Sequence, residues 1–248
     1  MKVLGLIPAR MGSSRFPGKP MAKILGKPMI GHVYENVIQS KSLDSTYVAT
    51  CDKEIFDYIL SIGGNAVMTS SAHERASDRC AEALLAIEKE KGFQYDIIVM
   101  IQGDEPMTKS EMIDEAINPM LSDKSIKIVN LLAPIESLEE FEDRNCIKVV
   151  CDLNGNAIYF SREPIPTRSK TNSIDMQKQV CIIPFVRNFL IEYTKLVPTP
   201  LEIAESVDMM RVLEHGFKVK MIPTNYKSYA VDTPEDLVRV EKILSSNI

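Results

Sequence analysis

The sequence lacks the cysteine and histidine spacing that is typical of metal sites and disulfide frameworks. Its five cysteines are odd in number and none stands in a CxxC pair, and His73 and His215 have no second histidine or cysteine at ligand spacing. Zinc and disulfides are therefore not expected. We expect reduced, buried thiols and a cytoplasmic protein.

Long apolar runs and positive net charge are missing too. No window approaches ~18 uninterrupted apolar residues, so no membrane span is predicted. The formal net charge is −5, whereas nucleic-acid binders are usually basic overall. We therefore expect no nucleic-acid partner, and any binding of phosphate must use local positive charge.

What is present in the first half is an alternation of apolar runs and amphipathic segments. The apolar runs are Val3–Ile7, Tyr47–Thr50, Ala66–Met68 and Ile97–Ile101, and the helices between them are predicted near Met29–Ser40, Lys53–Ile62 and Asp78–Lys91. This rhythm predicts an α/β protein with a mostly parallel central sheet flanked by helices. Its ligand crevice is expected at the carboxyl ends of the strands, in the loops that start at Pro8, Cys51, Thr69 and Gln102.

The second half is more irregular. Strand-like pieces lie at Ile126–Leu132, Cys146–Cys151, Ala157–Phe160 and Val180–Phe185, with a polar, mobile loop expected at Thr167–Gln177. A helix at Leu201–Glu214, a strand at Lys218–Ile222 and a last helix capped by Thr233 with Pro234 in its first turn follow. We predict one domain over 1–248, with a nucleotide-binding core at 1–130, an inserted acceptor or dimerisation subdomain at about 131–200, and a return to the core at 201–248.

The segment Pro8–Lys19 concentrates cations, glycines and small hydroxyl residues directly after the first strand. Such a loop suits phosphate oxygens, although an ordinary solvated loop is the alternative. The Walker pattern does not fit, because the glycine spacing is wrong and Pro20 follows Lys19. The dinucleotide fingerprint G-x-G-x-x-G is absent as well, which argues against an oxidoreductase.

Two aspartates follow strands at the same predicted edge. Asp104 comes directly after Ile97–Ile101 in the run Gln102–Pro106, and Asp232 occupies a similar place late in the chain. Two carboxylates near a triphosphate are what magnesium needs, because it takes one or two protein oxygens and the rest from phosphate and water. The alternative is that Asp104 shapes a turn and Asp232 caps a helix.

Several motifs resemble those of the 3-deoxy-manno-octulosonate cytidylyltransferase (CMP-KDO synthetase) family. They are Ile7–Arg10, Ser13–Arg15, Pro17–Pro20, Gln102–Pro106, Tyr159–Arg162 and Val231–Leu237, and they run nearly end to end. The resemblance implies a Rossmann-like nucleotidyltransferase fold and a homodimer. It also implies magnesium-dependent transfer of CMP from CTP to the anomeric hydroxyl of a 2-keto-3-deoxy sugar acid such as KDO, with release of pyrophosphate.

The same resemblance assigns residue roles. It implies that Arg10, Ser13, Arg15 and Lys19, within a loop that includes Pro8, Ala9 and Ser14, hold the triphosphate. Ser77, Arg79 and Gln102 would surround the cytosine and ribose, and Asp104 and Asp232 would bind magnesium. Arg15, Lys19, Asp104 and Asp232 are the candidate catalytic residues, since little covalent work falls to the protein in this chemistry.

The acceptor side departs from the family pattern. Its candidate residues are Arg75, Gln102, Lys148, Arg162, Gln179 and Asp208. Arg75 replaces a small hydroxyl residue, Gln179 replaces a histidine, and Asp208 replaces a glutamate. Arg75 either binds the acceptor or pairs with Glu74 at the surface, and Lys148 either pairs with a substrate carboxylate or faces outward.

Three functions remain open at this point. The first is transfer to KDO, which would place the protein in lipopolysaccharide or capsule synthesis. The second keeps the CTP chemistry and uses a different small acidic acceptor, either another keto-sugar acid or a phosphate- or phosphonate-bearing acid. The third is a nucleotide-binding protein without turnover.

Overall fold

The chain folds into two compact units. The computed structural model describes residues 1–12, 15–170 and 175–246. One unit consists of Met1–Asp114 and Ser228–Ile248, and the other of Glu115–Lys227. The division falls within helix α4 (Ser110–Ser122).

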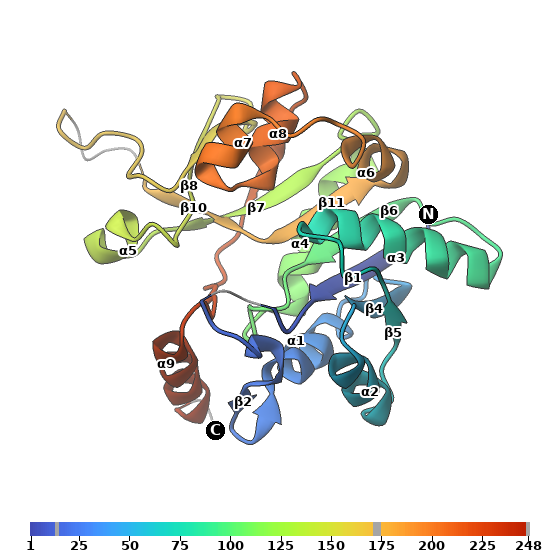
Figure 1. The fold of residues 1–248 in the computed structure, drawn as a ribbon. Coiled ribbons are helices and arrows are strands. Elements are labelled where there is room, and N and C mark those ends of the chain that lie inside the picture. Colours follow the sequence, from blue (N-terminus) through green and yellow to red (C-terminus); the bar gives the residue numbers. More distant parts are fainter. Residues whose placement is uncertain (13–14, 171–174, 247–248) are drawn as a thin grey trace. The chain divides into compact units, whose positions relative to one another are not determined.

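The first unit is built on parallel strands in the order β6-β1-β4-β5 (Figure 1). Their bounds are β1 (Val3–Ala9), β4 (Ser45–Thr50), β5 (Ala66–Met68) and β6 (Ile97–Ile101). Every residue of β1 and β6 is buried, which is typical of parallel strands covered on both faces. Leu6 of β1 pairs with Tyr47 on one side and Met100 on the other.

Helices alternate with these strands. They are α1 (Met29–Val37), α2 (Lys53–Ser61) and α3 (Ala76–Lys91), preceded by the short 3-10 helix η1 (Lys19–Met21) and the hairpin of β2 (Lys23–Ile24) and β3 (Lys27–Pro28). The C-terminal α9 (Pro234–Ser245) lies beside that hairpin (Figure 1). Ile24, Met29, Val231 and Val240 form one buried apolar cluster, so the two ends of the chain share a core.

The second unit contains a mixed sheet in the order β12-β7-β10-β8-β9. The strands of this sheet are β7 (Val129–Pro134), β8 (Lys148–Cys151), β9 (Ala157–Ser161), β10 (Gln177–Val180) and β12 (Lys220–Pro223). The strand β11 (Ile182–Val186) comes after β10 in the chain and is not part of this sheet. Its helices are α5 (Leu138–Glu142), α6 (Arg187–Tyr193), α7 (Pro200–Glu205) and α8 (Asp208–Glu214). Residues 171–174, in the polar loop predicted at Thr167–Gln177, lie outside the described residues.

Two predicted elements are each divided in the structure. The helix expected at Leu201–Glu214 is α7 and α8, because Ser206 adopts a left-handed conformation (φ 52°) that ends α7. The strand expected at Val180–Phe185 is the end of β10 and most of β11, which break at Cys181. Four of the five cysteines are half-buried rather than buried, and only Cys80 is enclosed.

The predicted α/β class, with a parallel sheet and flanking helices, is confirmed. Thr233 caps α9 and Pro234 lies in its first turn, also as predicted. Among the described residues, none of the helices combines the length and apolarity needed to cross a membrane.

Candidate active site

Four charged side chains of the first unit converge into one ionic cluster. Lys19 Nζ lies 2.9 Å from Asp104 Oδ2 and 3.4 Å from Asp232 Oδ1. Arg15 also reaches Asp232, with its terminal nitrogen 2.9 Å from the same Oδ1. The sequence predicted that the loop and both carboxylates share one crevice, and these distances bring them together.

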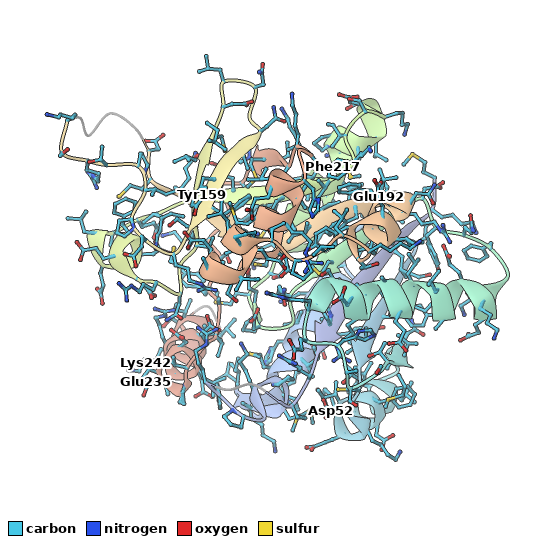
Figure 2. The ribbon with its side chains drawn as sticks, turned by 45° about the horizontal axis from the view of Figure 1, so that its top comes forward. Asp52, Tyr159, Glu192, Phe217, Glu235 and Lys242 are labelled. Carbon is cyan, nitrogen blue, oxygen red and sulfur yellow. The ribbon has the colours of Figure 1, made fainter. Side chains whose placement is uncertain are left out.

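The loop that carries Arg15 and Lys19 is closed by the main chain. The Gly18 N–H donates to the Met11 carbonyl over 2.9 Å, and Gly18 adopts φ 75°, which favours glycine. At the loop's start, the Met11 N–H donates to Asp52 Oδ2 over 2.8 Å, and Figure 2 labels this aspartate. Pro20 is buried directly after Lys19, so the lysine projects from an anchored base.

Asp104 is positioned by a tight passage of the chain after β6. A Cβ atom at Gly103 would lie 3.1 Å from the Pro8 carbonyl oxygen, so glycine lets this loop approach β1 closely. The Val231 N–H donates to the Asp104 carbonyl over 2.9 Å. This bond fixes the spacing between the two segments that carry the aspartates.

Asp232 is not used to cap the following helix. The Asp236 N–H donates to the Thr233 hydroxyl over 3.2 Å, and the Thr233 N–H donates back to the Asp236 carboxylate over 3.0 Å. Because this capping box satisfies the first turn of α9, the Asp232 carboxylate faces Lys19 and Arg15 instead.

The two carboxylates suit a divalent cation. The Lys19 ammonium group already bonds to both of them, which shows that they converge on one cationic position. In the part of the chain that the structure describes, no group of three or more His, Cys, Asp or Glu side chains could hold a metal. A pair of carboxylates agrees with magnesium, which takes its remaining ligands from phosphate and water.

The start of α3 carries three further residues that the sequence selected. Arg75 is its N-cap residue and Ser77 is fully buried. Arg79 is also buried, and its guanidinium donates to the Thr69 hydroxyl and, over 3.4 Å, to the His73 carbonyl. Arg79 therefore braces the loop after β5.

The remaining loop candidates lie at strand ends. Pro8 and Ala9 are the last residues of β1, Arg10 is exposed directly after them, and Gln102 is half-buried directly after β6. Ser13 and Ser14 lie outside the described residues.

Lys148, in the second unit, is fully buried. Its ammonium group donates to three main-chain carbonyls: Asp143 over 2.7 Å, Cys146 over 2.6 Å and Arg162 over 2.6 Å. Burial lowers the pKa of Lys148, while the three carbonyls satisfy the three donors of its charged form. The outward-facing alternative for Lys148 is therefore wrong, because the side chain organises the turn before β8 and the end of β9.

Arg162, which closes β9, contacts the end of α7. Its Nε donates to the Glu205 carbonyl over 2.6 Å, and its N–H donates to the Glu205 carboxylate over 2.8 Å. Tyr159 and Ser161 donate to that same carboxylate through their hydroxyl groups. Figure 2 labels Tyr159 on β9.

Gln179 on β10 bonds to a buried neighbour on β7. Its Nε2 donates to Asn130 Oδ1, while Asn130 Nδ2 donates to the Val180 carbonyl over 2.6 Å. Because the NH2 group of Asn130 must face the Val180 carbonyl, its Oδ1 atom is the one that faces Gln179. The side-chain amides of both residues therefore have one orientation each. Asp208, the first residue of α8, accepts the Tyr193 hydroxyl through its carbonyl over 3.2 Å.

Three positioning residues were missed at the level of sequence. Asp52 comes two residues after the end of β4, so the strand-end rule that selected Asp104 could have found it. Asn130 and Glu205 carry no comparable signal, because their partners lie 49 and 43 residues away, respectively.

Comparison with known proteins identifies the family of the chain. A family model described as cytidylyltransferase matches residues 4–222, which places the protein among the CTP-dependent nucleotidyltransferases. Two relatives are named 3-deoxy-manno-octulosonate cytidylyltransferase. The one from Geobacter metallireducens is 42% identical over 256 residues, covering 99% of this chain and 98% of the relative. The one from Fusobacterium nucleatum is 42% identical over 247 residues, covering 100% and 98%.

A solved structure extends the similarity to the whole fold. It is a CMP:2-keto-3-deoxy-manno-octonic acid synthetase complexed with CTP, 33% identical, covering 100% of both chains with a TM-score of 0.92. The chain therefore belongs to the 3-deoxy-manno-octulosonate cytidylyltransferase family.

Proposed function

We propose that the protein transfers CMP from CTP to 3-deoxy-manno-octulosonate and releases pyrophosphate, with magnesium held by Asp104 and Asp232. The observation that carries this proposal is the convergence of Lys19 and Arg15 with these two carboxylates in one cluster. The acceptor rests on full-length relatives that carry that name.

The reaction forms a bond between the anomeric oxygen of the acceptor and the α-phosphorus of CTP. The bond from the α-phosphorus to the oxygen that bridges to the β-phosphorus breaks, and pyrophosphate leaves. When bound, magnesium supplies a Lewis acid that lowers the pKa of the attacking hydroxyl and neutralises phosphate charge.

The chain's own residues orient and stabilise the reactants. Lys19 and Arg15 exchange their carboxylate partners for oxygens of the β- and γ-phosphates, and so stabilise the charge that develops on the departing pyrophosphate. Arg10, exposed at the end of β1, provides a third cation for the triphosphate. Ser13, Ser14, Ser77, Arg79 and Gln102 complete the proposed nucleotide site.

The proposed acceptor residues are Arg75 and Gln102 in the first unit and Lys148, Arg162 and Gln179 in the second. Within the second unit, Arg162 and Lys148 are bonded to main-chain carbonyls, so they support the local fold around them. Gln179 directs its amide NH2 to Asn130 and is left to present its carbonyl oxygen, which suits a sugar hydroxyl. Asp208 is a further acceptor candidate. A homodimer and a cytoplasmic location are part of the same proposal, the latter supported by five free thiols.

The test is a pyrophosphate-release assay with CTP, magnesium and a panel of acceptors. The panel holds KDO, other 2-keto sugar acids and phosphonate-bearing acids, and mass spectrometry identifies the CMP ester. Turnover with KDO is expected. Turnover only with another acid would reassign the acceptor, and CTP binding without turnover on the whole panel would favour a protein that binds nucleotide without catalysis.

A further inference from the structure

The Lys19 side chain is largely enclosed between the two aspartates. Its exposed fraction is 13%, against 29% for Asp104 and 17% for Asp232. The ammonium group is therefore a partly desolvated cation shared by two carboxylates, in an environment that strengthens its attraction to both.

A metal ion and this ammonium group cannot use the same carboxylate oxygens together. Magnesium requires oxygen ligands at about 2.1 Å, and a lysine ammonium group at hydrogen-bond distance from the same oxygens would be repelled by the ion's double charge. Both carboxylates bond to Lys19 at once, so a metal that arrives first must displace it.

A triphosphate changes this competition. The Lys19 side chain is flexible and extends from the end of the loop that the Gly18–Met11 hydrogen bond closes. The charged oxygens of a triphosphate form stronger hydrogen bonds with its ammonium group than solvent does. Once Lys19 turns to the nucleotide, Asp104 loses the ammonium group that bonds to it, and Asp232 keeps only the more exposed Arg15. The metal can then take the place of the ammonium group.

We infer that Lys19 occupies the magnesium position in the nucleotide-free protein and makes metal binding conditional on nucleotide. This inference rests on the proposed function, because it uses the same pair of carboxylates. Its consequence is a binding order in which the nucleotide binds before the metal that these aspartates hold, or together with it. It also gives Lys19 two successive partners, the carboxylates and then the phosphates.

The test measures Mn²⁺ binding by electron paramagnetic resonance, a readout that needs no turnover. Wild-type protein without nucleotide is expected to bind Mn²⁺ weakly, and with CTP tightly. Lys19→Met keeps the side-chain length and removes the charge. Nucleotide-free Mn²⁺ affinity is therefore expected to rise about tenfold, because the metal no longer has to displace the ammonium group and competes only with the half-exposed Arg15 for Asp232. Adding Asp104→Asn to Lys19→Met should abolish the gain.

Lys27→Met is the matched control, because Lys27 pairs with Glu35 elsewhere in the same unit and its loss changes net charge equally. This variant should bind Mn²⁺ as wild type does. Lys19→Gln provides a second neutral side chain, and thermal unfolding checks that each variant is folded. Equal nucleotide-free Mn²⁺ affinity in wild type, Lys19→Met and Lys19→Gln would overturn this inference and would leave the proposed function unaffected. Absence of Mn²⁺ binding to wild type with CTP, beyond what CTP binds by itself, would overturn the metal assignment of the proposed function as well.

Discussion

Lys19 Nζ and Asp104 Oδ2 lie 2.9 Å apart, although 85 residues separate them in the chain. The ammonium group belongs to the loop after β1 and the carboxylate to the loop after β6, which are neighbouring strands of one parallel sheet. Their contact is the direct result of strand ends meeting at one edge of the sheet.

Asp104→Asn tests the role of this carboxylate in catalysis. The change keeps shape and removes the charge that a metal needs, so kcat is expected to fall by at least ~10³-fold, or about 4 kcal/mol. The pyrophosphate-release assay measures it. Asp57→Asn is the control, because Asp57 pairs with exposed Lys53 on α2, and it should retain wild-type activity. Near-normal turnover of Asp104→Asn would remove Asp104 from the mechanism.

Arg15→Met tests the cation proposed to act on the leaving group. Because the guanidinium is expected to act mainly on developing charge, kcat should fall by ~10²-fold with a smaller change in KM for CTP. Arg239→Met is a closely matched control. Arg239 pairs with Asp236 at 2.9 Å with 57% exposure, and Arg15 pairs with Asp232 at 2.9 Å with 49% exposure. Equal kinetics of the two variants would contradict the assignment.

A buried ion pair joins α7 and α8 in the second unit. Arg211 contacts Glu202 through two bonds, of 2.6 Å and 2.7 Å, and the exposed fractions are 5% and 0%. Arg211→Met leaves a buried carboxylate without this partner, so we expect a loss of ~3–5 kcal/mol in the free energy of unfolding, measured with urea. Arg144→Met breaks the exposed pair with Glu163 and should cost under ~1 kcal/mol. A loss that small for Arg211→Met would show that the pair is not stabilising.

Cys146 gives a pH dependence that can be measured. Burial raises the pKa of its thiol from 9.0 to about 11. The folded state therefore holds this proton more tightly than the unfolded chain, so the thiol's contribution is complete below pH 9.0 and is lost as the pH rises through about 11. That loss should amount to ~2–3 kcal/mol in the free energy of unfolding. Cys146→Ala should lose correspondingly less stability than wild type between pH 8 and pH 11, and identical pH profiles would contradict the shift.

The first unit was the more predictable part of the fold. Short apolar runs gave the bounds of β5 and β6, and Thr233 with Pro234 marked the start of α9. Helix α4 carried no prediction, and Pro119 inside it disrupts the usual helix signals. The break at Ser206 is a left-handed residue that is not a glycine, so no residue type announced it.

The candidate site, like the fold, could be predicted only in part from the sequence. Strand ends explain why Lys19 and Asp104 meet, because they follow the neighbouring parallel strands β1 and β6. They do not explain Asp232, because β12, the last strand before it, belongs to the other sheet. Pattern could not predict that the cations pair with the carboxylates, since such pairing depends on the distances in the folded chain. For the same reason Lys148 was left undecided, and only its three carbonyl partners show what it bonds to.

The first unit is assembled from two stretches of chain, Met1–Asp114 and Ser228–Ile248, and Asp232 belongs to the second. During synthesis, the ribosome releases the loop of Lys19 and the strand that precedes Asp104 long before it releases Asp232. A nascent chain, or one cut short after Lys227, thus carries the cations and one carboxylate but not the other. Completion of this charged cluster therefore has to wait until the segment after Lys227 has been synthesised and has packed onto the first unit.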